Sequence, residues 1–218
     1  MIIHVPNKNT LIIDEFKLKC SVGKSGLNSN KKEGDHSTPK GLFNLRKLYF
    51  RKDRVGIPKC KINKKIIEQD MAWCDDPKHK KYNEEIKTYN RNLKENLYRK
   101  DHRYDYLITI SHNEKKIPNK GSAVFIHLTD NYKPTAGCVA LKKKDFEILI
   151  KLINNFGKST APINSNIQIT NEIICKTPHP SIHYYRQAIS SSTMRKNIFD
   201  VGTQCAKKLL EENGNITS

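Results

Sequence analysis

The stretch from residue 125 to residue 141 constrains this chain more than any other. It reads F-I-H-L-T-D-N-Y-K-P-T-A-G-C-V-A-L. An apolar run of β type, from Ala123 to Leu128, places His127 near its end. A second short apolar run begins at Cys138, after a polar loop. We therefore expect a β-rich domain in which two strands present a histidine and a cysteine, a layout that suits a thiol nucleophile and its base.

The chemistry of acyl transfer explains these residue types. A thiol has an unperturbed pKa near ~8.5, so a neighbouring imidazolium or backbone donors are needed to stabilise the thiolate. His127 meets this need and can later move the proton. Gly137, which lacks a Cβ, allows a sharp turn that points backbone amides at an oxyanion. Taken alone, however, the pair fits a structural role better, with Cys138 as a small buried apolar side chain and His127 as a hydrogen-bonded group.

Ordered motifs along the chain support the catalytic interpretation. The stretch resembles the active-site signature of the L,D-transpeptidase catalytic domain (YkuD-type) family, in which a His precedes a Ser/Thr-x-Gly-Cys-hydrophobic motif. The matching residues are His127, Thr135, Gly137, Cys138 and Val139. Upstream blocks follow in the order of a subgroup that ends in T-A-G-C-V-A-L: G-K-S-G (23–26), K-E-G-D-H-S-T-P-K-G (32–41), R-K-D-R (51–54), W-C-D-D-P (73–77), Y-N (82–83), Y-R-K-D-H-R-Y-D (98–105) and G-S-A-V-F-I-H (121–127). The resemblance covers about residues 1 to 170.

This resemblance implies a mainly β fold, sandwiched or closed like a barrel, with packed helices. It also implies a bacterial enzyme of peptidoglycan biosynthesis and cell shape. Cys138 would attack a stem tetrapeptide, release D-Ala and form a thioester, with His127 as the base, backbone amides near Gly137 as oxyanion donors and Thr135 shaping the loop. An amine would then complete a cross-link. Water would instead make the protein an L,D-carboxypeptidase-type hydrolase. No metal or organic cofactor is expected.

Two departures from the family pattern leave substrate binding open. Many members carry a His before the Gly-Cys pair and an Arg two residues after the Cys, where this chain has Ala136 and Ala140. The candidates for substrate binding, by proximity to the motif blocks, are Arg54, Arg99, Arg103 and Trp73. Solvated surface positions are the alternative for the arginines, and a packing role is the alternative for the tryptophan.

Composition limits the range of partners. The chain has 218 residues, 40 of them Lys or Arg and 22 Asp or Glu, for a formal charge of +18. Such a balance favours polyanionic surroundings such as an acidic wall polymer. The lysines are scattered, without an Arg-rich helix or a basic stripe interleaved with aromatic residues, so nucleic acid is not expected. A catalytically idle protein that binds wall or polyanion is the alternative from another class.

The cysteines give no sign of a metal site. They form no C-x-x-C pair, which disfavours zinc ribbons and thioredoxin-like motifs, and their disulfide state is open. Cys175, His179 and His183 have the spacing of loose ligands, but Pro178 and Pro180 interrupt any helix that would align them. The six are Cys20, Cys60, Cys74, Cys138, Cys175 and Cys205.

The implied function and the amino-terminal sequence point to different locations. Peptidoglycan chemistry implies the cell envelope or periplasm. The opening M-I-I-H-V-P lacks the apolar region of about 7 to 15 residues that a signal peptide needs, and no run of about 20 apolar residues predicts a membrane span. A cytoplasmic location is therefore the alternative.

Hydrophobic patterning divides the chain into a catalytic domain, residues 1–171, and a tail, residues 172–218. Within the domain, residues 59–105 are predicted to be a mixed insertion with a helix around 83–98. A second helix is predicted for residues 145–156 from apolar residues at spacings of three and four. The tail is predicted to carry one amphipathic helix that docks on the domain or binds a partner. The oligomeric state is not predicted.

Overall fold

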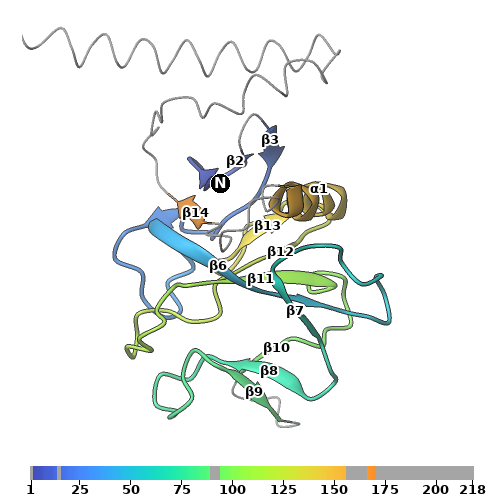
Figure 1. Ribbon diagram of the computed structural model, residues 1–218. Coiled ribbons are helices and arrows are strands. Elements are labelled where there is room, and N and C mark those ends of the chain that lie inside the picture. The colour runs from blue at the N-terminus through green and yellow to red at the C-terminus, as the bar shows by residue number, and fades with distance from the viewer. Residues whose placement is uncertain (1, 14–15, 89–93, 156–165, 170–218) are drawn as a thin grey trace, which may run out of the picture. The chain divides into compact units, whose positions relative to one another are not determined.

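A computed structural model describes residues 2–13, 16–88, 94–155 and 166–169 (Figure 1). The predicted helix in the tail, the end of the helix predicted for 145–156, and Cys175, His179 and His183 lie outside the described residues. No described helix is long and apolar enough to cross a membrane.

Strands are the main regular secondary structure of the described residues. A large sheet contains nine of them: β1 (Ile2–Val5), β2 (Thr10–Ile13), β3 (Phe16–Lys19), β6 (Gly41–Phe50), β7 (Asn63–Ile66), β11 (Tyr106–Ile110), β12 (Phe125–Leu128), β13 (Val139–Leu141) and β14 (Asn166–Ile169). A small sheet contains β8 (Met71–Cys74), β9 (Glu85–Lys87) and β10 (Lys94–Asn96). A third pair joins β4 (Leu27–Asn28) to β5 (Thr38–Pro39).

The large sheet is nearly closed. Its strand order is β13-β12-β11-β6-β14-β1-β2-β3, and β7 pairs with β6 outside this path. After β3, Ser21 bridges to Ala140 in β13 through N–H···O bonds of 2.9 and 2.8 Å, and Gly23 bridges to Thr135. These bridges connect the two ends of the strand order. The prediction of a mainly β, barrel-like fold is confirmed.

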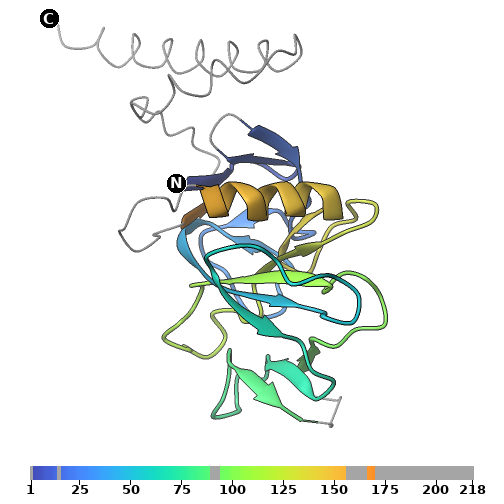
Figure 2. The same cartoon turned by 45° about the vertical axis from the view of Figure 1, so that its right-hand side comes forward.

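The helix α1 (Lys143–Asn155) covers one side of the large sheet, as Figure 2 shows. Phe146, Leu149, Ile150 and Ile153 are buried in the main hydrophobic cluster, in agreement with the predicted apolar face. The ring of Phe146 stacks on Tyr106 at 5.7 Å between centroids. The helix thus fixes the strands that lead to the His-Cys stretch.

A second, smaller hydrophobic cluster connects the large sheet to the small one. Its buried members include Tyr49, Leu107 and Phe125 from the large sheet and Met71 from β8. Cys138 belongs to this cluster too. The small sheet therefore packs on the side of the large sheet that carries the nucleophile candidate.

The prediction of a helix around residues 83–98 is wrong. The described residues in this range form β9 and β10, which pair antiparallel with either edge of the buried strand β8. Pairing with β8 decides the conformation of these residues. Asn83 has a φ of 57°, which already departs from helical geometry.

Two segments near the amino terminus are not single strands. The run from Thr10 to Leu18 contains parts of both β2 and β3, which pair antiparallel. The segment from Cys20 to Val22 contains the bridge from Ser21 to Ala140 and is not a strand.

Candidate active site

Two neighbouring parallel strands carry His127 and Cys138. His127 lies in β12, and Cys138 comes directly before β13. The register of the two strands aligns His127 with Ala140. Because side chains alternate along a strand, His127 shares a face with Phe125, and Cys138 shares a face with Ala140. The intervening side chains of both strands, including Ile126 and Val139, point into the main core. The topology therefore places the imidazole and the thiol on one face, over the smaller cluster.

Aromatic rings surround these two side chains. The buried ring of Tyr104 packs edge-on against His127 at 5.3 Å and against Phe125 at 6.1 Å between centroids. The Tyr104 hydroxyl donates to Glu95 at 2.9 Å, which satisfies its polar end. The packing fixes the orientation of the imidazole on the face it shares with Cys138.

The thiol of Cys138 is enclosed and hydrogen-bonded. Its side chain is 8% exposed; Sγ accepts from the Phe125 N–H at 3.3 Å and donates to the Ala123 carbonyl at 3.2 Å. The pKa of this thiol is raised to about 12, chiefly by burial and also by the charge of Glu95, while the Phe125 N–H and Lys31 act in the opposite direction. In the free protein the sulfur is therefore held as a neutral thiol at neutral pH.

The imidazole of His127 is also neutral. Its pKa is lowered to about 4, chiefly by burial and also by the charges of Arg103 and Arg99, while the hydrogen bond to the Leu128 carbonyl acts in the opposite direction. Its Nδ1 lies 2.8 Å from the Leu128 carbonyl oxygen. Because a carbonyl only accepts, Nδ1 carries the proton and donates, which leaves Nε2 free to accept one. The ring is thus in the tautomer required of a base.

The turn before Cys138 is held by Thr135. The Thr135 hydroxyl donates to the Cys138 carbonyl at 2.6 Å and accepts from the Gly137 N–H at 3.1 Å. Gly137 has a φ of 152°, and a Cβ there would lie 2.9 Å from the Ser37 carbonyl oxygen. The glycine is therefore required by backbone conformation and by close packing. Since Thr135 engages the Gly137 amide, the Cys138 N–H is the better oxyanion donor of the two expected from the sequence.

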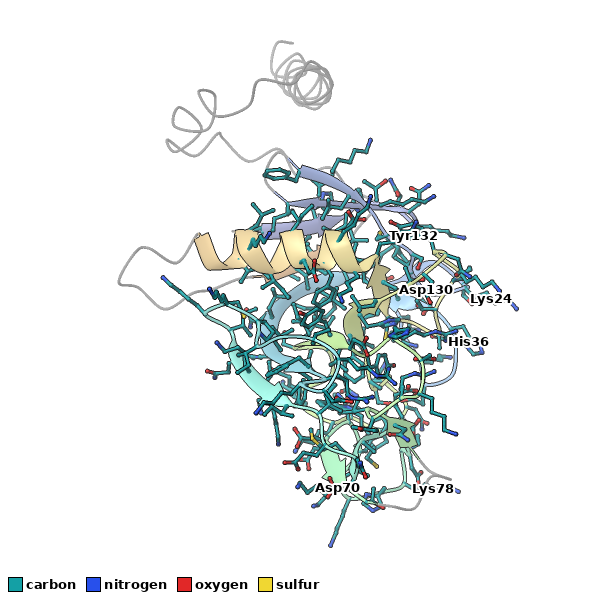
Figure 3. All side chains as sticks on the ribbon, turned by 90° about the vertical axis from the view of Figure 1, so that its right-hand side faces the viewer. Lys24, His36, Asp70, Lys78, Asp130 and Tyr132 are labelled. Atoms are coloured by element: carbon teal, nitrogen blue, oxygen red, sulfur yellow. The ribbon has the colours of Figure 1, made fainter. Side chains whose placement is uncertain are left out.

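Two loops meet beside this turn. Lys24 and His36 lie on the loop between β3 and β6, and Asp130 and Tyr132 lie on the loop after β12; Figure 3 shows these four side chains on the same side of the molecule. The Lys24 N–H donates to the Thr135 carbonyl at 2.9 Å and so connects the loops. This contact fixes the first loop against the segment that precedes Cys138.

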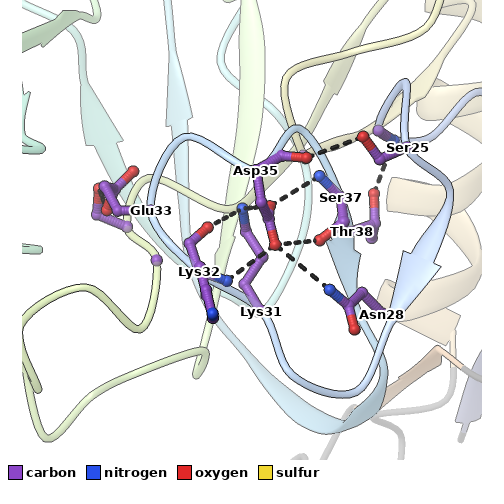
Figure 4. A network of polar contacts seen from close by, with 12 residues as sticks. Ser25, Asn28, Lys31, Lys32, Glu33, Asp35, Ser37 and Thr38 are labelled. Atoms are coloured by element: carbon purple, nitrogen blue, oxygen red, sulfur yellow. Dashed lines mark hydrogen bonds and ion pairs between the residues drawn. The ribbon is translucent and has the colours of Figure 1, made fainter.

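A polar network organises the first loop (Figure 4). The Lys31 ammonium, whose side chain is 6% exposed, pairs with Asp35 at 2.5 Å and donates to the Lys32 carbonyl at 2.9 Å. Asp35 also accepts from the Lys32 N–H at 2.9 Å, from the Ser37 N–H at 2.9 Å and from the Ser37 hydroxyl at 2.7 Å. Burial alone would raise the pKa of Asp35, but these hydrogen bonds outweigh it and lower the pKa. Lys31 and Asp35 therefore form an ion pair that is held by hydrogen bonds within the same loop.

The three candidate arginines are not equivalent. Arg54 pairs with the buried Asp105 at 3.1 Å and donates to the carbonyls of residues 100 and 101, which is a structural role. Arg99 binds Asp101 and lies over the Tyr104 ring at 5.1 Å. Arg103 is 58% exposed, and its contact with Asp101 is long, at 3.6 Å. Arg103 thus combines a loosely held guanidinium with a position near His127.

Trp73 packs against two other aromatic side chains. Its ring meets Phe125 edge-on at 5.2 Å and Tyr49 at 6.5 Å, and its Nε1–H donates to the Asn83 side chain at 2.9 Å. The indole therefore joins the small sheet to the strand that carries His127. It is half-buried, so one part of the ring borders the site.

Three contributors to the site were not found from the sequence. They are Lys31, Tyr104 and Glu95, which surround the Gly137 turn, the imidazole and the thiol. Tyr104 lies inside a motif block, which was the only available signal. Lys31 is one of many scattered lysines, and nothing in its local sequence distinguishes it.

The described residues show neither a metal site nor a disulfide. Cys20, Cys60, Cys74 and Cys138 are free and buried, and no described group of His, Cys, Asp and Glu could hold a metal ion.

A nearly closed β sheet thus places a His and a Cys on one face of two parallel strands, an arrangement that suits a thiol-dependent enzyme. The chain belongs to the L,D-transpeptidase catalytic domain (YkuD) family, whose family model matches residues 2–174. Enzymes of this family are cysteine-dependent and act on peptidoglycan.

Other comparisons are distant. No curated protein matches the chain significantly. The structure of Bd1075 from Bdellovibrio bacteriovorus is 13% identical, with a TM-score of 0.38; the match covers 93% of this chain and 54% of that chain. The chain thus spans about half the length of that protein, and a likeness at this TM-score carries no argument.

Proposed function

We propose that this chain is a peptidoglycan L,D-transpeptidase that uses Cys138 as its nucleophile. The observation that carries the proposal is the placement of His127 and Cys138 on one face of β12 and β13, with His127 Nε2 free to accept a proton. Family membership supplies the substrate class, the stem peptides of peptidoglycan.

The first half-reaction releases D-Ala. The Cys138 sulfur bonds to the carbonyl carbon that precedes the terminal D-Ala of a stem tetrapeptide, and its proton passes to His127 Nε2. The C–N bond to D-Ala then breaks, and His127 returns the proton to the leaving amine. The Cys138 N–H stabilises the oxyanion, an effect worth roughly 2.7 to 4 kcal/mol per donor in comparable sites.

The second half-reaction consumes the thioester. An amine of a second stem peptide attacks the thioester carbon, the C–S bond breaks, and the amine proton returns to sulfur through His127. The product is a cross-link. With water as the acceptor, the product is a shortened tripeptide, which is the outcome of an L,D-carboxypeptidase.

The decisive experiment follows disaccharide tetrapeptide by mass. Purified protein should release D-Ala, yield a cross-linked dimer and form an adduct with a carbapenem at Cys138. Cys138→Ala should abolish all three, with a loss of turnover of at least about 10³-fold, because nothing else forms the thioester. The matched control is Cys20→Ala, which removes another buried thiol.

The outcomes separate the alternatives. Release of D-Ala without a dimer would establish the hydrolase. Turnover that survives in Cys138→Ala would show that the nucleophile is another group. An intact protein that forms neither thioester nor carbapenem adduct would establish the idle, wall-binding alternative.

We further propose that Arg103 binds the carboxylate of the donor peptide. The support is its exposed guanidinium, its weak contact with Asp101 and its influence on His127. Arg103→Gln should raise KM for the tetrapeptide about tenfold, as expected for loss of a charge-assisted hydrogen bond, and leave kcat nearly unchanged. Arg46→Gln, which removes an exposed arginine paired with Glu114, is the control. An unchanged KM in Arg103→Gln would exclude this role.

A further inference from the structure

The side chain of Lys31 occupies a place that a lysine rarely takes. Only 6% of it is exposed, and lysines are almost never buried unless they are paired. Gly121 makes room for it, because a Cβ there would lie 2.9 Å from Lys31 Cγ. At Gly137 the position of a Cβ lies 3.7 Å from both Cε and Nζ of Lys31, which is van der Waals contact. The ammonium therefore lies against the residue that precedes Cys138.

The pairing of Lys31 fixes the position of this charge. Asp35 holds the ammonium at 2.5 Å and is itself held by Ser37 and by the Lys32 N–H (Figure 4). The Ser37 carbonyl oxygen also packs against Gly137, 2.9 Å from where a Cβ would lie. The loop, the ion pair and the Gly137 turn thus form one unit.

Acyl transfer at this turn develops negative charge that the free protein does little to offset. The thiol and the imidazole are both neutral before reaction, and Glu95 is the nearby group that opposes charge on sulfur. Among the described residues, Lys31 is the cation that acts on Cys138 in the opposite sense. A fixed positive charge in a water-poor site costs no rearrangement when negative charge appears.

We propose that Lys31, held by Asp35, is a positioning residue of the acyl-transfer site that packs the Gly137 turn and supplies the positive charge favouring the thiolate of Cys138. This inference rests on the proposed function. Lys31 acts through its packing against the Gly137 turn and through its electrostatic field.

The test measures how fast iodoacetamide alkylates Cys138 in the full chain as pH is varied, with the modified peptide followed by mass spectrometry. Lys31→Met keeps the length of the side chain and removes its charge, so Cys138 should react about tenfold more slowly below the thiol pKa, and the profile should move to higher pH. Lys31→Arg should restore most of the rate. Lys32→Met, which removes an exposed charge one residue away, should match the wild type.

Asp35→Asn separates the charge effect from loosening of the loop. It removes the partner anion and leaves the ammonium uncompensated, so Cys138 should react about threefold to tenfold faster at a given pH. Loosening would change both variants in the same direction and would also speed alkylation of Cys20, the buried internal reference.

Opposite shifts in Lys31→Met and Asp35→Asn, with Cys20 unchanged, would support the proposal. Equal rates in wild type and Lys31→Met, or shifts of the same sign in both variants, would overturn it. Turnover of disaccharide tetrapeptide is followed in parallel. A wild type without turnover would contradict the proposed function, while the alkylation rates would still decide the role of Lys31.

Discussion

Burial shifts the pKa values of Cys138 and His127 in opposite directions. The pKa of Cys138 rises to about 12 and that of His127 falls to about 4, because desolvation disfavours the charged form of each. The site is therefore stored as a neutral thiol and a neutral imidazole, not as an ion pair. Under the proposed function, bound substrate supplies part of the stabilisation that charge separation requires.

The low pKa of His127 predicts a loss of stability in acid. Between pH 6.5, the ordinary pKa of histidine, and about pH 4, this imidazole is protonated in the unfolded chain but stays neutral in the folded protein. Stability thus falls as pH decreases through this window. The contribution between pH 7 and pH 5 is about 2 kcal/mol.

Chemical denaturation of wild type and His127→Gln at both pH values measures this contribution. The variant should lose about 2 kcal/mol less than the wild type on acidification, whatever its stability at pH 7. His79→Gln, at an exposed position, should behave as the wild type does. Equal losses in wild type and His127→Gln would mean that the imidazole titrates normally in the folded protein.

At the level of elements, two units build the site. The parallel pair β12 and β13 carries the reactive residues, and the small sheet covers the face on which they lie. The link between the units is largely aromatic, with Trp73 between Phe125 and Tyr49. Packing of the small sheet should therefore control access to the thiol.

Trp73→Ala tests this link. Loss of the indole removes two edge-to-face contacts and the hydrogen bond to Asn83, so the free energy of unfolding should fall by about 3 kcal/mol. Alkylation of Cys138 should become faster because the covering sheet opens more often. Trp73→Phe, which keeps an aromatic ring, should give a free energy of unfolding and an alkylation rate between those of the wild type and Trp73→Ala. A stable Trp73→Ala protein with an unchanged alkylation rate would show that another contact holds the small sheet.

Local pattern predicted some elements and misled on others. β11 and β12 are clear in the sequence because they are short continuous apolar runs, and the core of α1 is clear because its apolar residues have helical spacing. β9 and β10 have no such pattern, since their pairing with the buried strand β8 decides their conformation. The motif indicated His127 and Cys138, but the engagement of the Gly137 amide by Thr135 is visible only in three dimensions.

At the level of the whole molecule, the site depends on contacts between distant parts of the sequence. Ser21 pairs with Ala140, and Lys31 lies against Gly121 and Gly137, so the first 40 residues complete a site whose reactive groups lie beyond residue 120. Single-sequence patterns do not predict such pairings, because each partner looks ordinary in its own neighbourhood. The charge of Lys31 is equally inconspicuous in a chain with 40 basic residues.

The enclosed thiol of Cys138 has a consequence for the lifetime of the protein. Oxidants such as peroxide react with thiolates, so a sulfur that stays protonated and 8% exposed is protected from conversion to sulfenic acid. The same enclosure means that a covalent inhibitor must wait for the site to open. Under the proposed function, its potency should depend first on how well it mimics the donor peptide and only second on the reactivity of its electrophile.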